Sequence, residues 1–406
     1  MSTRGSLPLV GAIPESSVKP RWALAAKGFR PFFLLAAAFG AVVVPAWLLV
    51  LGGVLRTNAY LDATSWHAHE MVFGFAVAVI AGFLLTAVGN WTQRETAVGA
   101  PLLALSVLWV LGRIAMVAAG LLPRGVPAIV DLSFLPMLVW ILARPLVAAK
   151  SRRNFVMLAV LCALFAANVV VHLEALGVVA MGSGRRACLV GIDIVVLVIQ
   201  IIAGRVFPMF TRSATGVASI RTVPVVDVLT IVAMAVLTVV DVFAAESAGA
   251  AVLSGVVGVL AAVRAIHWGA RYSAHQPLLW ILHAGYAWIP FGLLLRTVAW
   301  FDVAVPRSLA THALTVGAIG SLTLGMMARV ALGHSGCPLV VAKPIAWAFA
   351  AISAAGIARV VVPLLAPAWY FPSLVTAGAL WSIAFLVFVV VYAPLLSKRR
   401  MDGKAG

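Results

Sequence analysis

The chain has 406 residues, of which 64% are hydrophobic and only 10% charged, and its formal net charge is +17. Soluble domains carry about 25% charged residues, so these proportions exclude a soluble fold that hides its apolar side chains from water. Long unbroken apolar runs also exclude a membrane β-barrel, whose strands alternate in polarity. The sequence therefore predicts an all-α, polytopic integral membrane protein in a lipid bilayer.

Apolar stretches of roughly 20 residues are long enough to cross a bilayer as helices. About twelve transmembrane helices are predicted, and the stretch 250–268 is the weakest because it is rich in Gly and Ala. They form a single membrane domain, 27–397, between a flexible cytoplasmic tail, 1–26, and a basic cytoplasmic tail, 398–406. The predicted spans are 32–53, 66–89, 101–122, 126–145, 155–176, 187–208, 225–243, 250–268, 278–300, 309–332, 345–365 and 372–395.

Lys and Arg residues are distributed unevenly between the two sides of these spans. Of the 29, 21 fall on the side of both termini and seven on the opposite side, while Arg113 lies within the third span. Because cytoplasmic loops carry the excess of positive charge, both termini are predicted to be cytoplasmic. This bias explains the net charge without nucleic acid as a partner. The first apolar run follows roughly 30 mixed residues, so no cleavable signal peptide is expected.

Ionisable side chains within a membrane are costly and mark functional sites. The second span begins with His67 and His69, while His172 and His312 lie near the outer ends of the fifth and tenth spans. These four histidines are therefore predicted at one level in the outer part of the membrane, although they come from three helices. The carboxylates at the same level are Glu70, Asp131, Glu174 and Asp193.

Imidazole nitrogen is a good ligand for iron, copper and zinc, and a haem in a helix bundle takes axial histidines from facing helices. Four histidines at one depth fit such a site; the alternative is that each caps a helix end or hydrogen-bonds a neighbour. At about 100° per residue, His67 and His69 point roughly 160° apart. They cannot both ligate one metal, so two adjacent sites are predicted, or one ligand with Glu70 orienting His67.

The second and tenth spans share a spacing of small residues. At offsets +5, +9 and +13, His69 is followed by Gly74, Ala78 and Gly82, and His312 by Gly317, Ser321 and Gly325. Small-residue stripes let helix backbones approach closely. With 34 glycines in the chain the match can be coincidental. It nevertheless favours a parallel construction in which His69 and His312 are the axial ligands of one haem.

Two arginines, Arg113 in the third span and Arg359 in the eleventh, are the most deeply embedded in the predicted membrane domain. An ion pair or a side chain that reaches toward the interface is the ordinary explanation. The alternative is that they neutralise haem propionates, because Arg binds carboxylates well. Both are therefore candidate cofactor-binding residues.

Several stretches are specific enough to indicate a family. The longest are KGFRPFFLLA (27–36), WHAHEMVFGFAVAVIAGFLLTAVGNWT (66–92) and HALTVGAIGSLTLGMMARVALGHSGCPL (312–339). Shorter ones are GR (112–113), NVVVHLEALG (168–177), GRVFPMFT (204–211) and LLWILHAGYAW (278–288). From residue 27 to residue 396 the chain resembles the NnrS family of bacterial membrane proteins. Cys337 is a departure, where the family pattern has Arg.

This resemblance implies a protein of the bacterial inner membrane that contains copper and haem, which we expect to be b-type. It also implies a part in the response to nitric oxide and nitrosative stress, and hence a link to denitrification. The family histidines that this chain shares are His67, His69, His172, His283, His312 and His334. All but His334 are candidate metal ligands, and His334 joins Glu70 and Glu174 as a further site residue.

Three functional classes are compatible with the sequence. The first is a haem–copper protein that binds nitric oxide, processes it with an unidentified electron donor, or protects metal centres from it, which leaves oxidoreductase activity open. The second is a secondary transporter of a small solute, whose site would lie near the midplane, and the third is a haem-based sensor without turnover. Haem–copper oxidases offer an architectural analogy, with haem histidines on helices 2 and 10. The sixth and seventh spans here lack histidine, and so lack the copper ligands of those enzymes.

Overall fold

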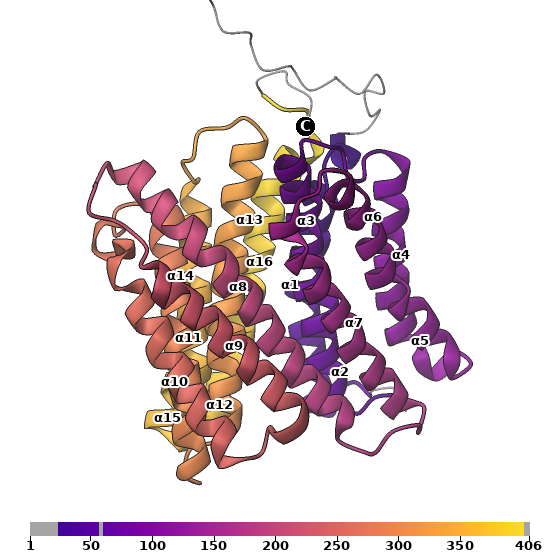
Figure 1. Cartoon of the computed structure of the whole chain (residues 1–406). Coiled ribbons are helices and arrows are strands. Elements are labelled where there is room, and N and C mark those ends of the chain that lie inside the picture. Colours follow the sequence, from indigo (N-terminus) through magenta and orange to yellow (C-terminus); the bar gives the residue numbers. More distant parts are fainter. Residues whose placement is uncertain (1–22, 57–59, 402–406) are drawn as a thin grey trace, which may run out of the picture.

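The computed structural model describes residues 23–56 and 60–401, and it is an all-helical bundle within these ranges (Figure 1). In the described part of the chain, twelve helices are long and apolar enough to cross a membrane. Each overlaps one predicted span, including the weakest, which is Ala248–Trp268. The predicted membrane fold is therefore confirmed. The two predicted tails lie outside the described residues, except for 23–26 and 398–401.

Most spans are single helices. Three others, the second, tenth and eleventh, change from α-helix to π-helix and back. The helices are α1 (Phe29–Leu51), α2 (Ala63–His69), η2 (Glu70–Ala76), α3 (Val77–Thr92), α4 (Ala100–Val117), α5 (Gly125–Leu132), α6 (Phe134–Ala148), α7 (Val156–Ala175), α8 (Ser183–Thr215), α9 (Pro224–Ala244), α10 (Ala248–Ala265), α11 (Pro277–Phe301), α12 (Arg307–His312), η7 (Ala313–Gly320), α13 (Ser321–His334), α14 (Lys343–Gly356), η8 (Ile357–Val361), α15 (Val362–Leu365) and α16 (Tyr370–Ser397).

Most predicted span ends differ from the observed ones by a few residues, and two spans depart further. The fourth span is divided at Ser133 into α5 and α6. The sixth was predicted to end at Pro208, but α8 continues through this proline to Thr215. Proline is tolerated inside a membrane helix where nearby groups satisfy the backbone that it leaves free, so it is a weak stop signal here.

The first and last membrane helices pack side by side and close the bundle (Figure 1). The Trp381 indole donates a hydrogen bond to the Gly40 carbonyl at 3.0 Å, and buried Arg30 donates to the Leu396 carbonyl at 2.9 Å. We call the side that carries η1 (Ala23–Ala25) and the end of α16 the terminal face, and the opposite side the distal face. Both α2 and α12 begin at the distal face (Figure 1).

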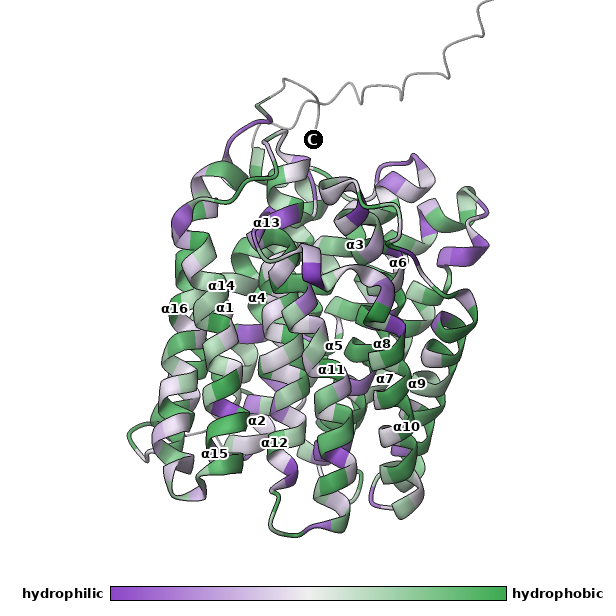
Figure 2. Cartoon of the chain, turned by 90° about the vertical axis from the view of Figure 1, so that its left-hand side faces the viewer, coloured by the Kyte–Doolittle hydropathy of each residue, from purple (hydrophilic) through white to green (hydrophobic). Residues whose placement is uncertain are grey.

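The outer surface of the bundle is apolar along the length of the helices (Figure 2). Large apolar side chains point outward from the peripheral helices, among them Val239, which is 58% exposed, and Val390, which is 66% exposed. By contrast, the α2–η2–α3 span is the most enclosed and α8 is the next. Polar residues on these two enclosed spans therefore face protein rather than lipid.

Three spans contain a π-helical segment: η2 follows His69, η7 follows His312, and η8 includes Arg359. Such segments are rare and occur frequently at functional sites. In the second and tenth spans the histidine is the last residue before the π-helix, so the parallel seen in the sequence extends to the backbone.

Small residues of the tenth span pack against large neighbours, as the predicted stripe requires. A Cβ atom at Gly317 would overlap the Trp288 indole. We therefore expect Gly317→Ala to lower the thermal unfolding midpoint in detergent, since overpacking a core costs about 1–3 kcal/mol. Gly249→Ala is the control, because its new Cβ would have only the Ser247 hydroxyl oxygen nearby, at 3.9 Å. Equal midpoints for the two variants would contradict this close packing.

Candidate functional site

The histidines that open the second span face two different environments. His69 is fully buried among polar side chains, whereas His67 lines a large cavity. This separation follows from the helix period, because residues two apart on an α-helix lie on nearly opposite sides. The two rings therefore face apart as the helix phase predicts, but Glu70 pairs with His69 and does not orient His67.

The first site is a buried polar cluster of six residues. It consists of His69 and Glu70 at the α2–η2 junction, Arg113 on α4, Asp131 on α5, and Asn168 and His172 on α7. Arg113 binds both carboxylates: one of its terminal nitrogens donates to Glu70 Oε1 at 2.7 Å, and the other donates to Asp131 Oδ1. These ion pairs tie three separate helical segments together, which are η2, α4 and α5.

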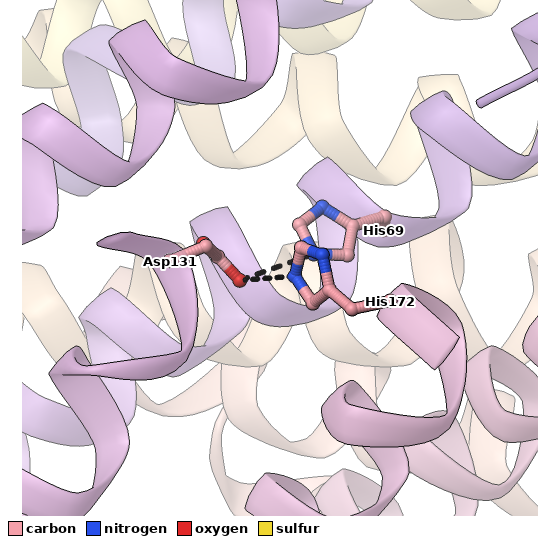
Figure 3. Close-up of side chains that lie close together, drawn as sticks. All are labelled: His69, Asp131 and His172. Carbon is pink, nitrogen blue, oxygen red and sulfur yellow. Dashed lines mark hydrogen bonds and ion pairs between the residues drawn. The ribbon is translucent and has the colours of Figure 1, made fainter. Parts of the chain in front are cut away.

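Three members of the polar cluster are arranged as metal ligands (Figure 3). Asp131 Oδ2 lies 3.0 Å from His172 Nε2 and 3.3 Å from His69 Nε2. One ligand atom from each residue lies within 4.8 Å of the others. On the other side of its ring, His69 Nδ1 lies 2.9 Å from Glu70 Oε1. A carboxylate behind a ligating histidine fixes the ring orientation in many metal sites.

The charges of the polar cluster do not balance without a further cation. With both histidines neutral, two carboxylates face a single guanidinium, and all three side chains are almost completely buried. An uncompensated charge in a low-dielectric interior is very costly. A metal ion or a histidine-bound proton would supply the missing positive charge, so the cluster is suited to hold a cation.

Tyr60 lies on the distal side of the polar cluster, outside the membrane-spanning helices. Burial raises the pKa of Tyr60 to about 12, so its hydroxyl keeps its proton at neutral pH. The hydroxyl oxygen lies 2.7 Å from His172 Nδ1. Since a phenol can donate or accept, Tyr60 can pair with either neutral form of the His172 ring. The form in which Nδ1 donates to Tyr60 leaves Nε2 free for a metal.

The second site is a cavity of about 740 Å³, which we call the distal cavity. Its wall includes His67 from α2, His312 from α12 and Arg359 from η8. It reaches the distal face, because Met181, which is 96% exposed, also lines it. The distal cavity therefore lies between the enclosed centre of the bundle and one aqueous side.

Several polar atoms in the wall of the distal cavity lack partners among the described residues. They are His67 Nδ1 and the Nε and Nη1 atoms of Arg359, all buried. His67 also stacks on Trp47 at a centroid distance of 4.2 Å. His312 Nδ1 donates to the Ser308 carbonyl at 2.7 Å, which leaves its Nε2 lone pair unused in the neutral ring. Buried groups without partners indicate room for a ligand.

The structure places the predicted haem pair, His69 and His312, in different sites. His312 lines the distal cavity together with His67, while His69 belongs to the polar cluster. The two predicted arginines are divided in the same way. Arg359 lines the distal cavity, and Arg113 is engaged with two carboxylates of the polar cluster.

The remaining predicted site residues make local contacts elsewhere. Glu174 accepts hydrogen bonds from the backbone N–H groups of Gly182 and Gly184 at the start of α8. His283 Nε2 lies 2.9 Å from the Thr211 hydroxyl, and the His334 ring packs on Phe29 at 5.7 Å. None of these three residues lines the distal cavity as described or belongs to the polar cluster.

Two residues at the first site were missed from the sequence, Asn168 within the polar cluster and Tyr60 beside it. Asn168 donates to Asp131 Oδ2 at 2.7 Å, and its side-chain oxygen lies 3.0 Å from His69 Nε2. A single amide carries little signal, although its position one helical turn before His172 places both on one face of α7. Tyr60 follows three residues whose placement is outside the described ranges, and nothing local to it indicates its partner.

Comparison with known proteins identifies a family over nearly the whole chain. A family model described as NnrS protein matches residues 23–400. No curated protein matches the chain. The matched region contains every residue of the polar cluster and the whole wall of the distal cavity.

The double ion pair of Arg113 generates a stability prediction. Arg113→Gln leaves two buried carboxylates without their cation, and breaking a buried pair costs about 3–5 kcal/mol. We expect a large fall in the thermal unfolding midpoint in detergent. Arg307→Gln is the control, because the Arg307–Glu246 pair at 3.7 Å is exposed and such pairs contribute less than about 1 kcal/mol. An Arg113 variant as stable as the control would show that the ion pairs do not hold the helices.

Proposed function

The chain belongs to the NnrS family, and on this premise we propose that it is a haem- and copper-binding membrane protein of the nitric oxide response. In this proposal it binds nitric oxide or processes it by redox chemistry, or it protects other metal centres from it. The observation that carries the proposal is the distal cavity, where two histidines from different helices and a partly unpaired buried arginine face one space.

Haem is proposed for the distal cavity because the wall residues match what a haem requires. The volume of about 740 Å³ lies within the range of cofactor pockets. His67 and His312 would supply nitrogen ligands to the haem iron, and Arg359 would pair with a propionate. The proposed haem pair is therefore His67 with His312, in place of His69 with His312.

Copper is proposed for the polar cluster, with His69, His172 and Asp131 as ligands. Imidazole nitrogen suits copper, and the cluster needs a positive charge to balance its carboxylates. Glu70 and Tyr60 would hold the two rings in place through the nitrogens that face away from the metal. Because His67 and His69 are two residues apart on α2, the two cofactors would be held by one helix.

The cofactors would bind nitric oxide and carry out one-electron chemistry. The chain would hold the cofactors and control the access of water and gas to them. Burial keeps bulk water from the polar cluster, while the lipid-facing surface lets a small neutral gas arrive from the bilayer. Reduction would need an electron donor, which is unidentified. By the distribution of Lys and Arg, we propose that the terminal face is cytoplasmic and that the membrane is the bacterial inner membrane.

Optical spectra of the detergent-purified protein test the haem assignment. We expect a haem spectrum that changes on reduction and again on adding nitric oxide. His67→Ala and His312→Ala should each lose it or shift it strongly, because each removes a proposed ligand of the haem iron. His283→Ala is the matched control, since this histidine bonds to Thr211 away from the distal cavity. A protein without haem, or one whose spectrum survives both cavity substitutions, would overturn the assignment.

Metal analysis of purified variants tests the copper assignment separately. His69→Ala and His172→Ala should reduce bound copper at least tenfold while keeping the haem spectrum, because neither histidine lines the distal cavity. His334→Ala, a substitution near the terminal face, should keep its copper. Copper that follows the His67 and His312 variants instead would move the copper site to the distal cavity.

A further inference from the structure

Asp193 and Asp241 form a buried carboxyl pair in the wall of the distal cavity. Asp193 comes from α8 and Asp241 from α9, two helices that pack together. They are 3% and 2% exposed, and both line the distal cavity. Neither residue holds a metal or a propionate in the function proposed above. The proposed function therefore does not explain why two carboxyl groups are buried here.

One arginine side chain, that of Arg296, lies within ion-pairing distance of both carboxyl groups. Arg296 of α11 binds Asp241 with both terminal nitrogens, at 2.6 and 2.5 Å. Its nearest approach to Asp193 is 3.8 Å, from Nη1 to Oδ2. The guanidinium is thus bound mainly to Asp241, and its electrostatic interaction with Asp193 is weaker. The other ion pair at the cavity wall, between Arg307 and Glu246, is internally balanced.

The excess of acid over base at this position favours a proton. Arg296 Nη1 lies 2.6 Å from Asp241 Oδ2 and 3.8 Å from Asp193 Oδ2, so two buried carboxyl groups share one guanidinium. Two carboxylates that share a buried site do not both ionise at neutral pH, and the proton belongs to the pair rather than to one residue.

We propose that the Asp193–Asp241 pair is the proton-holding group of the distal cavity. At neutral pH it carries one dissociable proton, which it transfers to a cavity ligand that has gained one electron from the donor of the proposed function. The carboxyl O–H bond breaks, the proton bonds to the ligand, and the resulting second carboxylate is stabilised by Arg296. Water at the distal face then returns a proton to the pair. The transfer rests on the proposed function, whereas the presence of the proton does not.

An aspartate elsewhere in the bundle shows how the chain neutralises a purely structural carboxylate. Asp227 of α9 pairs with Arg264 of α10 through a hydrogen bond from Arg264 Nε. There the ratio of acid to base is one to one, and no proton is needed. The pair of Asp193 and Asp241 on one arginine has an extra acid, and it faces a cavity. Asp227 therefore provides a matched control.

Infrared spectroscopy in H₂O and D₂O tests whether the pair holds a proton. The wild-type protein at neutral pH should show a protonated carboxyl C=O band that shifts in D₂O. The band should be lost in Asp193→Asn and also in Asp241→Asn, because the remaining carboxylate then pairs with Arg296 one to one. Asp227→Asn should keep it. Absence of the band in the wild type, or its survival in both cavity variants, would overturn the proposal.

The pH dependence of the cofactor's midpoint potential tests the transfer. Adding an electron near the pair should raise the proton affinity of the two carboxyl groups. The midpoint potential of the wild-type protein should therefore fall as pH rises. The slope of potential against pH should be smaller in Asp193→Asn and unchanged in Asp227→Asn. Equal slopes in all three proteins would contradict proton transfer to the cavity. A protein that lacks haem would refute the proposed function, while the infrared result would still decide whether the pair holds a proton.

Discussion

The constraint on which the structure depends is the neutralisation of charge inside a lipid-embedded bundle. Arg113 meets it for the polar cluster, because one guanidinium reaches Glu70 and Asp131 on two other helical segments. This junction fixes the rotation of the α2–η2 helix, since Glu70 is held toward α4. Once Glu70 faces α4, His69 is directed to Asp131 and Asn168, and His67 is directed to the other side. The positions of both sites therefore follow from one ion-pair junction.

The fold could be predicted from the sequence because lipid leaves few alternatives. A chain with unbroken apolar runs must satisfy its backbone within each run, and only helices do so. Helix phase also predicted that His67 and His69 point in different directions, which is a local property of α2. The boundary at Pro208 was wrong because a proline ends a helix only when its surroundings cannot compensate.

The partners of each histidine could not be predicted, because they depend on which helices are neighbours. The parallel between spans two and ten suggested His69 for the partner of His312, yet the side of α2 that faces the distal cavity carries His67. The small-residue stripes describe how each helix packs, and they do not specify which histidine shares a space with another. Asp131 and Asn168 likewise come from helices whose packing against α2 has no signature in the sequence.

The two sites share a physical feature that separates them from the rest of the bundle. At Arg264 and Asp227 one base meets one acid, which suffices for a structural pair. In the polar cluster and at Asp193 and Asp241, two acids meet one arginine. An excess acid inside a membrane protein is tolerated only if a proton or a metal ion balances it. The ratio of acids to bases therefore distinguishes the two positions to which the proposals above assign a copper ion and a proton, and one of them, the polar cluster, includes the first residue of the π-helical segment η2.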